Sequence, residues 1–263
     1  MNTTFTLKAA LLTLVTLFTV NTYAEVLVGQ RDTLPGFAFQ LMTQAQAGSN
    51  SASWTDGIQV YDKETEQAFR LFCTDLFTST STEFGNGEGQ LYHPASLTES
   101  QFHSDTQKSQ LQSLFDHVYT KAFNADYSYR NDLFATIFQL AVWEIANDTA
   151  DHLSLRDGYV YITKALVIDQ GLNGEYNRNH WDTTGTILNE ALDTLDTWFD
   201  AILNNSWEAI GYDEDKVNLT VYLADGGTDR SQTFIGVAPT PEPATMLLFG
   251  LGLAGLGLVR RKR

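Results

Sequence analysis

Two residues of this chain, Cys73 and Gln139, have side chains that can react with each other. Cys73 is the only cysteine and follows Phe72, and Gln139 lies in the apolar segment Phe138–Trp143. A thiolate is a strong nucleophile, and an amide held against it can be attacked at its carbonyl carbon. A buried amide without a partner also costs about 1–3 kcal/mol, so Gln139 should have a specific partner. A glutamine that simply hydrogen-bonds a backbone group of the core is the other interpretation.

The single cysteine is informative because the N-terminal segment predicts export. Lys8 supplies a positive charge, Ala9–Val20 is an apolar stretch, and Thr22–Ala24 is an acceptable cleavage site, so residues 1–24 have the features of a signal peptide. A short buried N-terminal helix is the alternative. Exported cysteines normally pair in disulfides, and here there is no second cysteine.

The C-terminal segment, residues 239–263, consists of three parts. They are, in chain order, the proline-rich motif Pro241-Glu242-Pro243, the uncharged apolar segment Ala244–Val259 and a basic cluster that includes Arg260 and Arg261. A helix over the apolar part would span roughly 24 Å, slightly less than a hydrocarbon core. Its basic end would stay in the cytoplasm, as in an ordinary C-terminal membrane anchor.

These three parts resemble the PEP-CTERM sorting signal of Gram-negative envelope proteins. The resemblance implies recognition of residues 239–263 by an exosortase-type membrane protease and transient anchoring in the inner membrane through the helix at 244–259. It also implies a final location at the cell envelope, on the outer surface or in the extracellular matrix.

The segment between the two ends, residues 25–238, is long enough for one large domain. The chain has 16 basic and 32 acidic residues; without Lys8, Glu242 and the four C-terminal basic residues, the acidic surplus is about 20. Such a surface repels phosphate backbones, which argues against nucleic-acid partners. It favours basic partners.

Hydrophobic periodicity predicts an α+β domain, with a helical insertion in a β framework. We expect helices at Ser109–Phe123, Asn131–Ala146 and Thr184–Asn204, and strands at Val26–Val28, Ile58–Tyr61, Ala68–Phe77, Tyr159–Ile168, Val217–Leu223 and Gln232–Val237. The second helix is apolar on most sides, which is typical of a central, buried helix. Gln139 therefore lies in the core.

The segments around Cys73 and Gln139 resemble the two signatures of the thioester domains at the tips of Gram-positive surface adhesins. In that family an aromatic–Cys pair is followed by a Thr-Gln-x-Ala-Ile/Val-Trp motif on a helix. The resemblance implies that the Cys73 sulfur and the Gln139 side-chain carbonyl carbon join with loss of ammonia. It also implies packing residues beside the bond, which are Phe72, Phe138, Ala141 and Trp143. Phe138 departs from the family, which usually has Thr there.

An internal thioester would make the protein a stored acylating reagent. It needs a nucleophile and an amide held in contact, and shelter from water. A lysine amine of a partner would displace Cys73 and form an amide with Gln139. We therefore expect covalent adhesion that is used once, not an enzyme, with no cofactor and no metal.

Other functions remain open at this point. A non-covalent envelope or carbohydrate-binding module with a buried free cysteine is the main alternative, because the chain has five tryptophans. A cysteine hydrolase would need a histidine beside Cys73, and no histidine is singled out. The five histidines lack zinc-site spacing. The acidic runs at 148–151 and 212–215 lack full EF-hand spacing, which leaves solvated loops or weak calcium sites.

Overall fold

The structure is a computed structural model that describes residues 26–28, 37–43, 52–53, 58–62, 68–76, 90–97, 104–123, 132–148, 151–170, 176–224 and 233–237. The predicted signal peptide (1–24), the sorting tail (239–263) and its apolar segment (244–259) lie outside these residues. Within the described ranges, no helix combines the length and apolar character that crossing a membrane requires.

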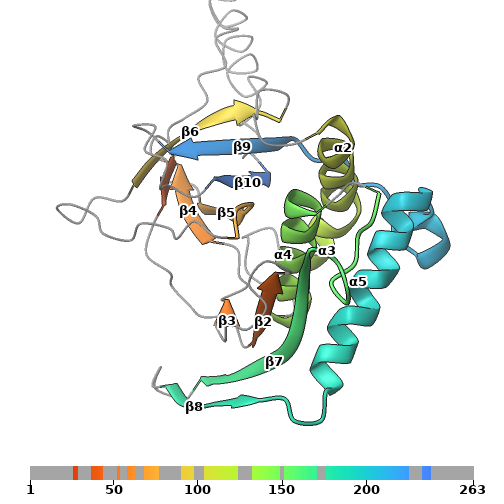
Figure 1. The fold of residues 1–263 in the computed structure, drawn as a ribbon. Helices are drawn as coiled ribbons and strands as arrows, with labels where there is room; N and C mark the ends of the chain where they lie inside the picture. Colours follow the sequence, from red (N-terminus) through yellow and green to blue (C-terminus); the bar gives the residue numbers. More distant parts are fainter. Residues whose placement is uncertain are drawn as a thin grey trace, which may run out of the picture.

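Six antiparallel strands form a closed barrel in the order β1-β4-β5-β10-β9-β6 (Figure 1). They are β1 (Val26–Val28), β4 (Ile58–Asp62), β5 (Ala68–Cys73), β6 (Gln90–Ser96), β9 (Leu219–Ala224) and β10 (Phe234–Val237). The last two strands of the chain thus pair with strands from its first half. This closure leaves no open edge in the barrel.

A second antiparallel sheet has the order β3-β2-β7-β8. Its strands are β2 (Phe37–Thr43), β3 (Ala52–Ser53), β7 (Val160–Gln170) and β8 (Tyr176–Trp181). One hydrophobic cluster joins both sheets, since it contains Phe39 and Leu41 of β2 together with Leu71 and Phe72 of β5.

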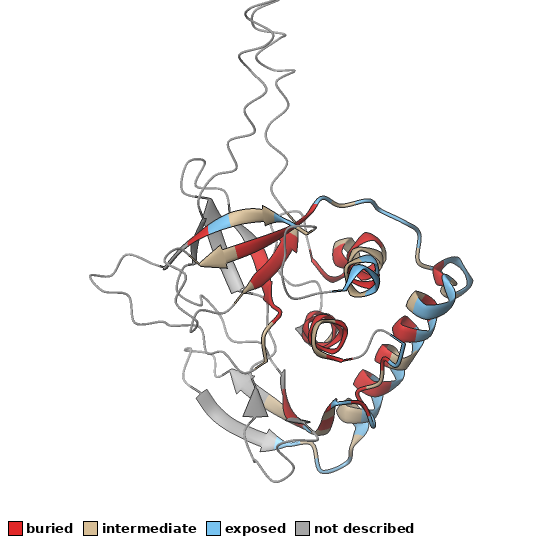
Figure 2. Cartoon of the chain, turned by 45° about the horizontal axis from the view of Figure 1, so that its top comes forward, coloured by how far each residue is buried: buried red, intermediate tan, exposed pale blue. Residues whose placement is uncertain are grey.

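The helices are inserted between the strands of these two sheets. They are α2 (Asp105–Leu114), a π-helical turn (Phe115–Tyr119), α3 (Thr120–Ala122), α4 (Asp132–Asn147), α5 (Thr186–Asn204) and a 3₁₀ turn (Trp207–Ile210). Ser104 begins α2 with a capping box, in which its hydroxyl accepts the Gln107 N–H and the Gln107 side chain accepts the Ser104 N–H. Figure 2 shows α5 buried on one side and exposed on the other.

The α+β class and the three long helices are confirmed. Each predicted strand is found: β1 has the predicted ends, and the others differ by a few residues at one end or both. The predicted end residues Phe77 and Gln232 lie outside the described residues. Four strands were not predicted, namely β2, β3, β6 and β8. Pro94 lies inside β6, where a proline argues against a central strand. The β framework consists of two sheets, because β7 pairs with β2 and β8 and not with the barrel.

Candidate functional site

The amide of Gln139 on α4 meets the backbone of Cys73 at the end of β5. The Cys73 N–H donates to Gln139 Oε1 at 3.1 Å, and Gln139 Nε2 donates to the Cys73 carbonyl oxygen at 2.9 Å. Gln139 is fully buried and Cys73 is 7% exposed. The structure therefore brings together the two residues that the sequence singled out, and the partner expected for the buried glutamine is the Cys73 backbone.

The direction of the Cys73 backbone explains this contact. On the β10 side of β5, the Thr74 N–H donates to the Thr233 carbonyl at 3.1 Å. Since backbone groups of successive strand residues point to opposite sides, the N–H and C=O of Cys73 point away from β10. The Gln139 amide binds both groups on that side.

Phe72 points to the opposite face from Cys73 and packs into an aromatic cluster under the site. Its ring centroid lies 4.9 Å from Phe138, 5.7 Å from Phe115 and 5.3 Å from Phe123. Phe138 is also 4.9 Å from Phe115. The residue that departs from the family motif is thus an integral part of this cluster. Tyr119, at the end of the π-helical turn, completes it at 6.2 Å from Phe72.

Cys73 lies on the face of β5 that carries Phe234 opposite it on β10. The Tyr92 ring packs against Phe234 with centroids 5.0 Å apart. Burial, and to a smaller extent the nearby Cys73, raises the pKa of Tyr92 to about 12. The phenol of Tyr92 therefore stays neutral at physiological pH. Cys73 itself is not in a disulfide.

One face of α4 runs along the end of β5. Asn147 lies two turns after Gln139 and donates from Nδ2 to the Thr74 carbonyl at 2.9 Å. Trp143 lies between them on the same face and is 5% exposed. Its buried Nε1 has no hydrogen-bond acceptor among the residues that the structure describes. Ala141 is fully buried. Gln139 and Asn147 therefore fasten the helix to consecutive residues of the strand.

Sequence reasoning missed Glu144, the next residue on α4. Its side chain is fully buried, and Oε1 accepts the Ser154 N–H at 2.6 Å. The Asp148 carboxyl lies within hydrogen-bonding reach and also accepts the Tyr159 N–H at 2.6 Å. Burial is the main cause that raises the pKa of Glu144 to about 9. The hydrogen bond from the Ser154 N–H opposes this rise, and the charges of Asp148 and Asp157 add to it. Glu144 is therefore protonated at neutral pH.

Because Gly158 has no side chain, the loop after α4 fits closely over Glu144 and Asp148. A Cβ at this position would lie 2.3 Å from the Ser154 carbonyl oxygen, 2.4 Å from Asp148 Oδ2 and 3.0 Å from Glu144 Oε1. Only glycine leaves room for both carboxyl groups. The loop that connects α4 to β7 is thus fixed to the helix that carries Gln139.

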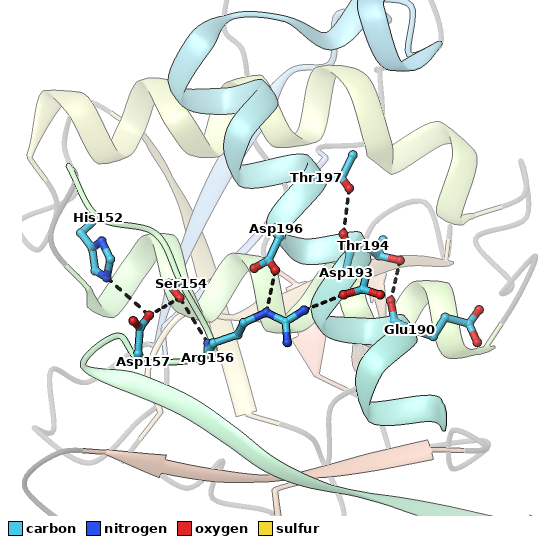
Figure 3. A network of polar contacts seen from close by, with 9 residues as sticks. All are labelled: His152, Ser154, Arg156, Asp157, Glu190, Asp193, Thr194, Asp196 and Thr197. Atoms are coloured by element: carbon cyan, nitrogen blue, oxygen red, sulfur yellow. Dashed lines mark hydrogen bonds and ion pairs between the residues drawn. The ribbon is translucent and has the colours of Figure 1, made fainter. Parts of the chain in front are cut away.

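Arg156 in the same loop forms ion pairs with α5 (Figure 3). Its Nη2 lies 2.6 Å from Asp193 and its Nε 2.7 Å from Asp196. The bond to Asp196 is the main cause that raises the pKa of Arg156 above its ordinary value. The side chains are 41–75% exposed, so water screens these pairs. They align the loop with α5 and do not touch Cys73.

Comparison with known proteins identifies the C-terminal segment first. Residues 239–263 match the PEP-CTERM protein-sorting motif, which confirms the sorting signal predicted there. A search of curated proteins finds no match to the chain.

Among solved structures, the chain is similar to the N-terminal domain of the Streptococcus pyogenes pilus tip adhesin Cpa, with 11% identity and a TM-score of 0.41 over 82% of this chain and 99% of that one. It is also similar to the N-terminal thioester domain of the fibronectin-binding protein SfbI from Streptococcus pyogenes, with 10% identity and a TM-score of 0.40 over 82% and 98%. A third is the N-terminal thioester domain of a surface protein from Clostridium perfringens, with 17% identity and a TM-score of 0.38 over 76% and 97%. The structural neighbours thus include thioester domains of Gram-positive surface proteins, the family that the sequence resembles.

Proposed function

We propose that this is an exported surface or matrix protein that attaches covalently to amine groups of a partner through an internal thioester between Cys73 and Gln139. The observation that carries the proposal is the double hydrogen bond between the Gln139 amide and the Cys73 backbone. It holds the backbone of the only cysteine of the chain against a fully buried amide.

Thioester formation would join two residues whose backbone and amide groups are already in contact. The Cys73 thiolate attacks Gln139 Cδ, and the negative charge that develops on Oε1 is stabilised by the Cys73 N–H that already donates to this oxygen. The bond from Cδ to Nε2 then breaks, and the nitrogen leaves as ammonia after taking up the proton of the thiol. One thiol and one primary amide thereby give one thioester and one ammonia.

Attachment to a partner breaks the thioester. A primary amine of the partner attacks Cδ, the thiolate of Cys73 leaves and takes up the proton that the amine loses, and an amide remains between Gln139 and the partner. No group is regenerated for a second round, so the protein is a single-use reagent and not an enzyme. It needs neither cofactor nor metal.

The burial of the site provides the shelter that a thioester needs. Gln139 is inaccessible, and the aromatic cluster around Phe72 closes one side of the strand. Exclusion of water slows hydrolysis of the stored bond. Cys73 is 7% exposed, so an amine would have to enter at the Cys73 side of the site.

In this proposal the sorting motif determines where the protein is located. An exosortase-type protease would recognise residues 239–263, including Pro241-Glu242-Pro243 and the basic residues Arg260 and Arg261, after the signal peptide has directed export. The helix at 244–259 would hold the protein in the inner membrane until processing. The mature domain would then face amine-bearing partners at the cell surface or in the matrix.

Intact mass spectrometry of the purified protein tests the thioester. We expect a mass deficit of roughly 17 Da, the mass of ammonia, and loss of this species on treatment with methylamine, which forms an adduct on Gln139. Cys73→Ala should have its full mass and form no adduct. A wild-type chain of full mass that does not react with methylamine would overturn the proposal.

Exposed aromatic residues favour a second candidate, a non-covalent carbohydrate-binding module. Trp181 and Tyr159 are each 39% exposed, whereas Trp143, Trp198 and Trp207 are buried. Aromatic rings on a surface can stack against sugar rings. Binding of Cys73→Ala to an amine-free polysaccharide, lost in Trp181→Ala, would support this candidate.

A further inference from the structure

The barrel brings one further polar side chain, the phenol of Tyr92, to the thiol of Cys73, and the use of this phenol rests on the proposed function. Cys73 ends β5, and Tyr92 lies on β6. In the closed barrel these two strands are separated by β9 and β10 on one side and by β1 and β4 on the other. They therefore face each other across the barrel interior, where inward side chains of one point toward the other.

The Cys73 and Tyr92 side chains both point into this interior. Phe234 of β10 lies opposite Cys73 in the strand register, and opposite residues of an antiparallel pair share one face. The Tyr92 ring packs on Phe234 with centroids 5.0 Å apart, and Tyr92 is 1% exposed. Phe72 points to the outer face, where it packs against Phe138 of α4. The thiol and the phenol thus share the interior with Phe234.

The thiol and the phenol are also close enough to interact electrostatically. Burial is the main cause of the raised pKa of Tyr92, and the nearby Cys73 adds to it. A negative charge on the sulfur makes the phenol harder to ionise. Tyr92 therefore keeps its proton, and remains a hydrogen-bond donor, when Cys73 is a thiolate.

We propose that Tyr92 donates a hydrogen bond to the Cys73 sulfur when an amine opens the thioester. The amine attacks Cδ of Gln139, the electron pair of the C–S bond moves to the sulfur, and the proton that the amine loses finally neutralises the thiolate. Tyr92 keeps its own proton throughout. Hydrogen bonds to charged groups are stronger than those to neutral ones, so the phenol stabilises the departing thiolate more than the intact thioester.

Burial makes such a donor important, because a thiolate that forms away from water loses its hydration. Burial alone would raise the pKa of the thiol and make the sulfur a poorer leaving group. A hydrogen bond from the phenol acts in the opposite direction, since it favours the charged form of the thiol.

Other titratable groups lie on the elements around Cys73. On the β5 segment, β6, β9 and α4, those with described side chains are Arg70, Asp75, His93, Tyr222, Glu144 and Asp148. Arg70 and His93 point to the outer face by strand alternation. Tyr222 points inward, because it lies opposite Phe234, and it is 2% exposed. Tyr222→Phe is therefore a matched control, since it removes another buried hydroxyl from the same interior.

Titration of the free thiol tests the contact between the two groups. The ultraviolet absorbance of the Cys73 thiolate is followed against pH in the full chain after methylamine has opened the thioester, with Cys73→Ala as the blank. Tyr92→Phe keeps the ring that packs on Phe234 and removes only the hydroxyl. We expect Tyr92→Phe to raise the thiol pKa by about 1–2 pH units, and Tyr222→Phe to change it much less.

The rate of opening by methylamine, measured by intact mass, tests the role in the reaction. Tyr92→Phe should slow it about ten-fold, the effect of one hydrogen bond to a charged group. Fluorotyrosine at position 92 has a more acidic phenol and is a stronger donor, so it should speed the opening and lower the thiol pKa. A change in packing alone would not move these two variants in opposite directions.

The inference is wrong if Tyr92→Phe leaves either the thiol pKa or the opening rate unchanged. Equal effects of Tyr92→Phe and Tyr222→Phe would also overturn it, because they would assign the effect to the polarity of the interior in general. A wild-type chain without the ammonia mass deficit is a separate result, since it contradicts the thioester itself and, with it, any role of Tyr92 in opening it.

Discussion

Replacing Glu144 with glutamine should stabilise the protein at neutral pH and do so progressively less as the pH falls. In the folded protein the buried Glu144 carboxyl has a pKa of about 9, raised from 4.5. Its stabilising contribution is complete below pH 4.5, where folded and unfolded chains are both protonated. It is lost as the pH rises toward 9, because only the unfolded chain ionises there.

The magnitude follows from the linkage between protonation and folding. Each pH unit between the two pKa values removes about 1.4 kcal/mol from the free energy of unfolding. At pH 7 the 2.5 units above 4.5 correspond to about 3 kcal/mol. Glu144→Gln keeps an oxygen that accepts the Ser154 N–H, and its amide does not ionise in the unfolded chain.

Urea unfolding followed by tryptophan fluorescence at pH 4.5, 5.5, 6.5 and 7.5 measures this difference. We expect Glu144→Gln and wild type to have similar unfolding free energies at pH 4.5, with the variant gaining up to about 3 kcal/mol near neutrality. Glu190→Gln on the exposed side of α5 is the matched control and should show no such trend. A Glu144→Gln effect that is constant across these pH values would refute the reasoning.

Three further substitutions test the packing around the site by the same unfolding assay. Gly236→Ala would place a Cβ 2.7 Å from the Arg70 carbonyl oxygen, so it should destabilise the barrel by about 1–3 kcal/mol; an unchanged midpoint would contradict this contact. Phe72→Ala empties the centre of the aromatic cluster and should cost about 3–5 kcal/mol, and a loss below 1 kcal/mol would show that the cluster collapses around the gap. Arg156→Ala should cost less than about 1 kcal/mol, an effect that 1 M salt removes; a larger, salt-insensitive loss would mean that more than screened ion pairs is involved.

The sequence was most informative where hydrophobic periodicity is strong. α5 and α4 were predicted nearly to their ends because long apolar stripes have few alternative explanations. β8 was missed because its residues, Tyr176–Trp181, are mostly polar and show no alternation. Which strands pair could not be predicted either, since the barrel joins β5 to β10 across most of the chain.

The candidate site was predicted from residue types and short motifs, and the structure adds how the two residues meet. Nothing in the sequence indicated that the Gln139 amide binds the backbone of Cys73, because this depends on how α4 lies against the end of β5. Glu144 was missed because a single acid among apolar residues does not show whether it is buried or solvated. Its burial depends on Gly158, which leaves room for the carboxyl group.

The place of Gln139 in the chain determines which elements would carry a mechanical load in the proposed function. Attachment releases Cys73, so a pull on Gln139 would pass along the backbone from α4 to β10, which precedes the sorting motif. Two strands in this path, β9 and β10, pair with β6 and β5, which lie outside it. The chain between Gln139 and the motif could therefore be extended only after these strand pairs of the barrel had separated.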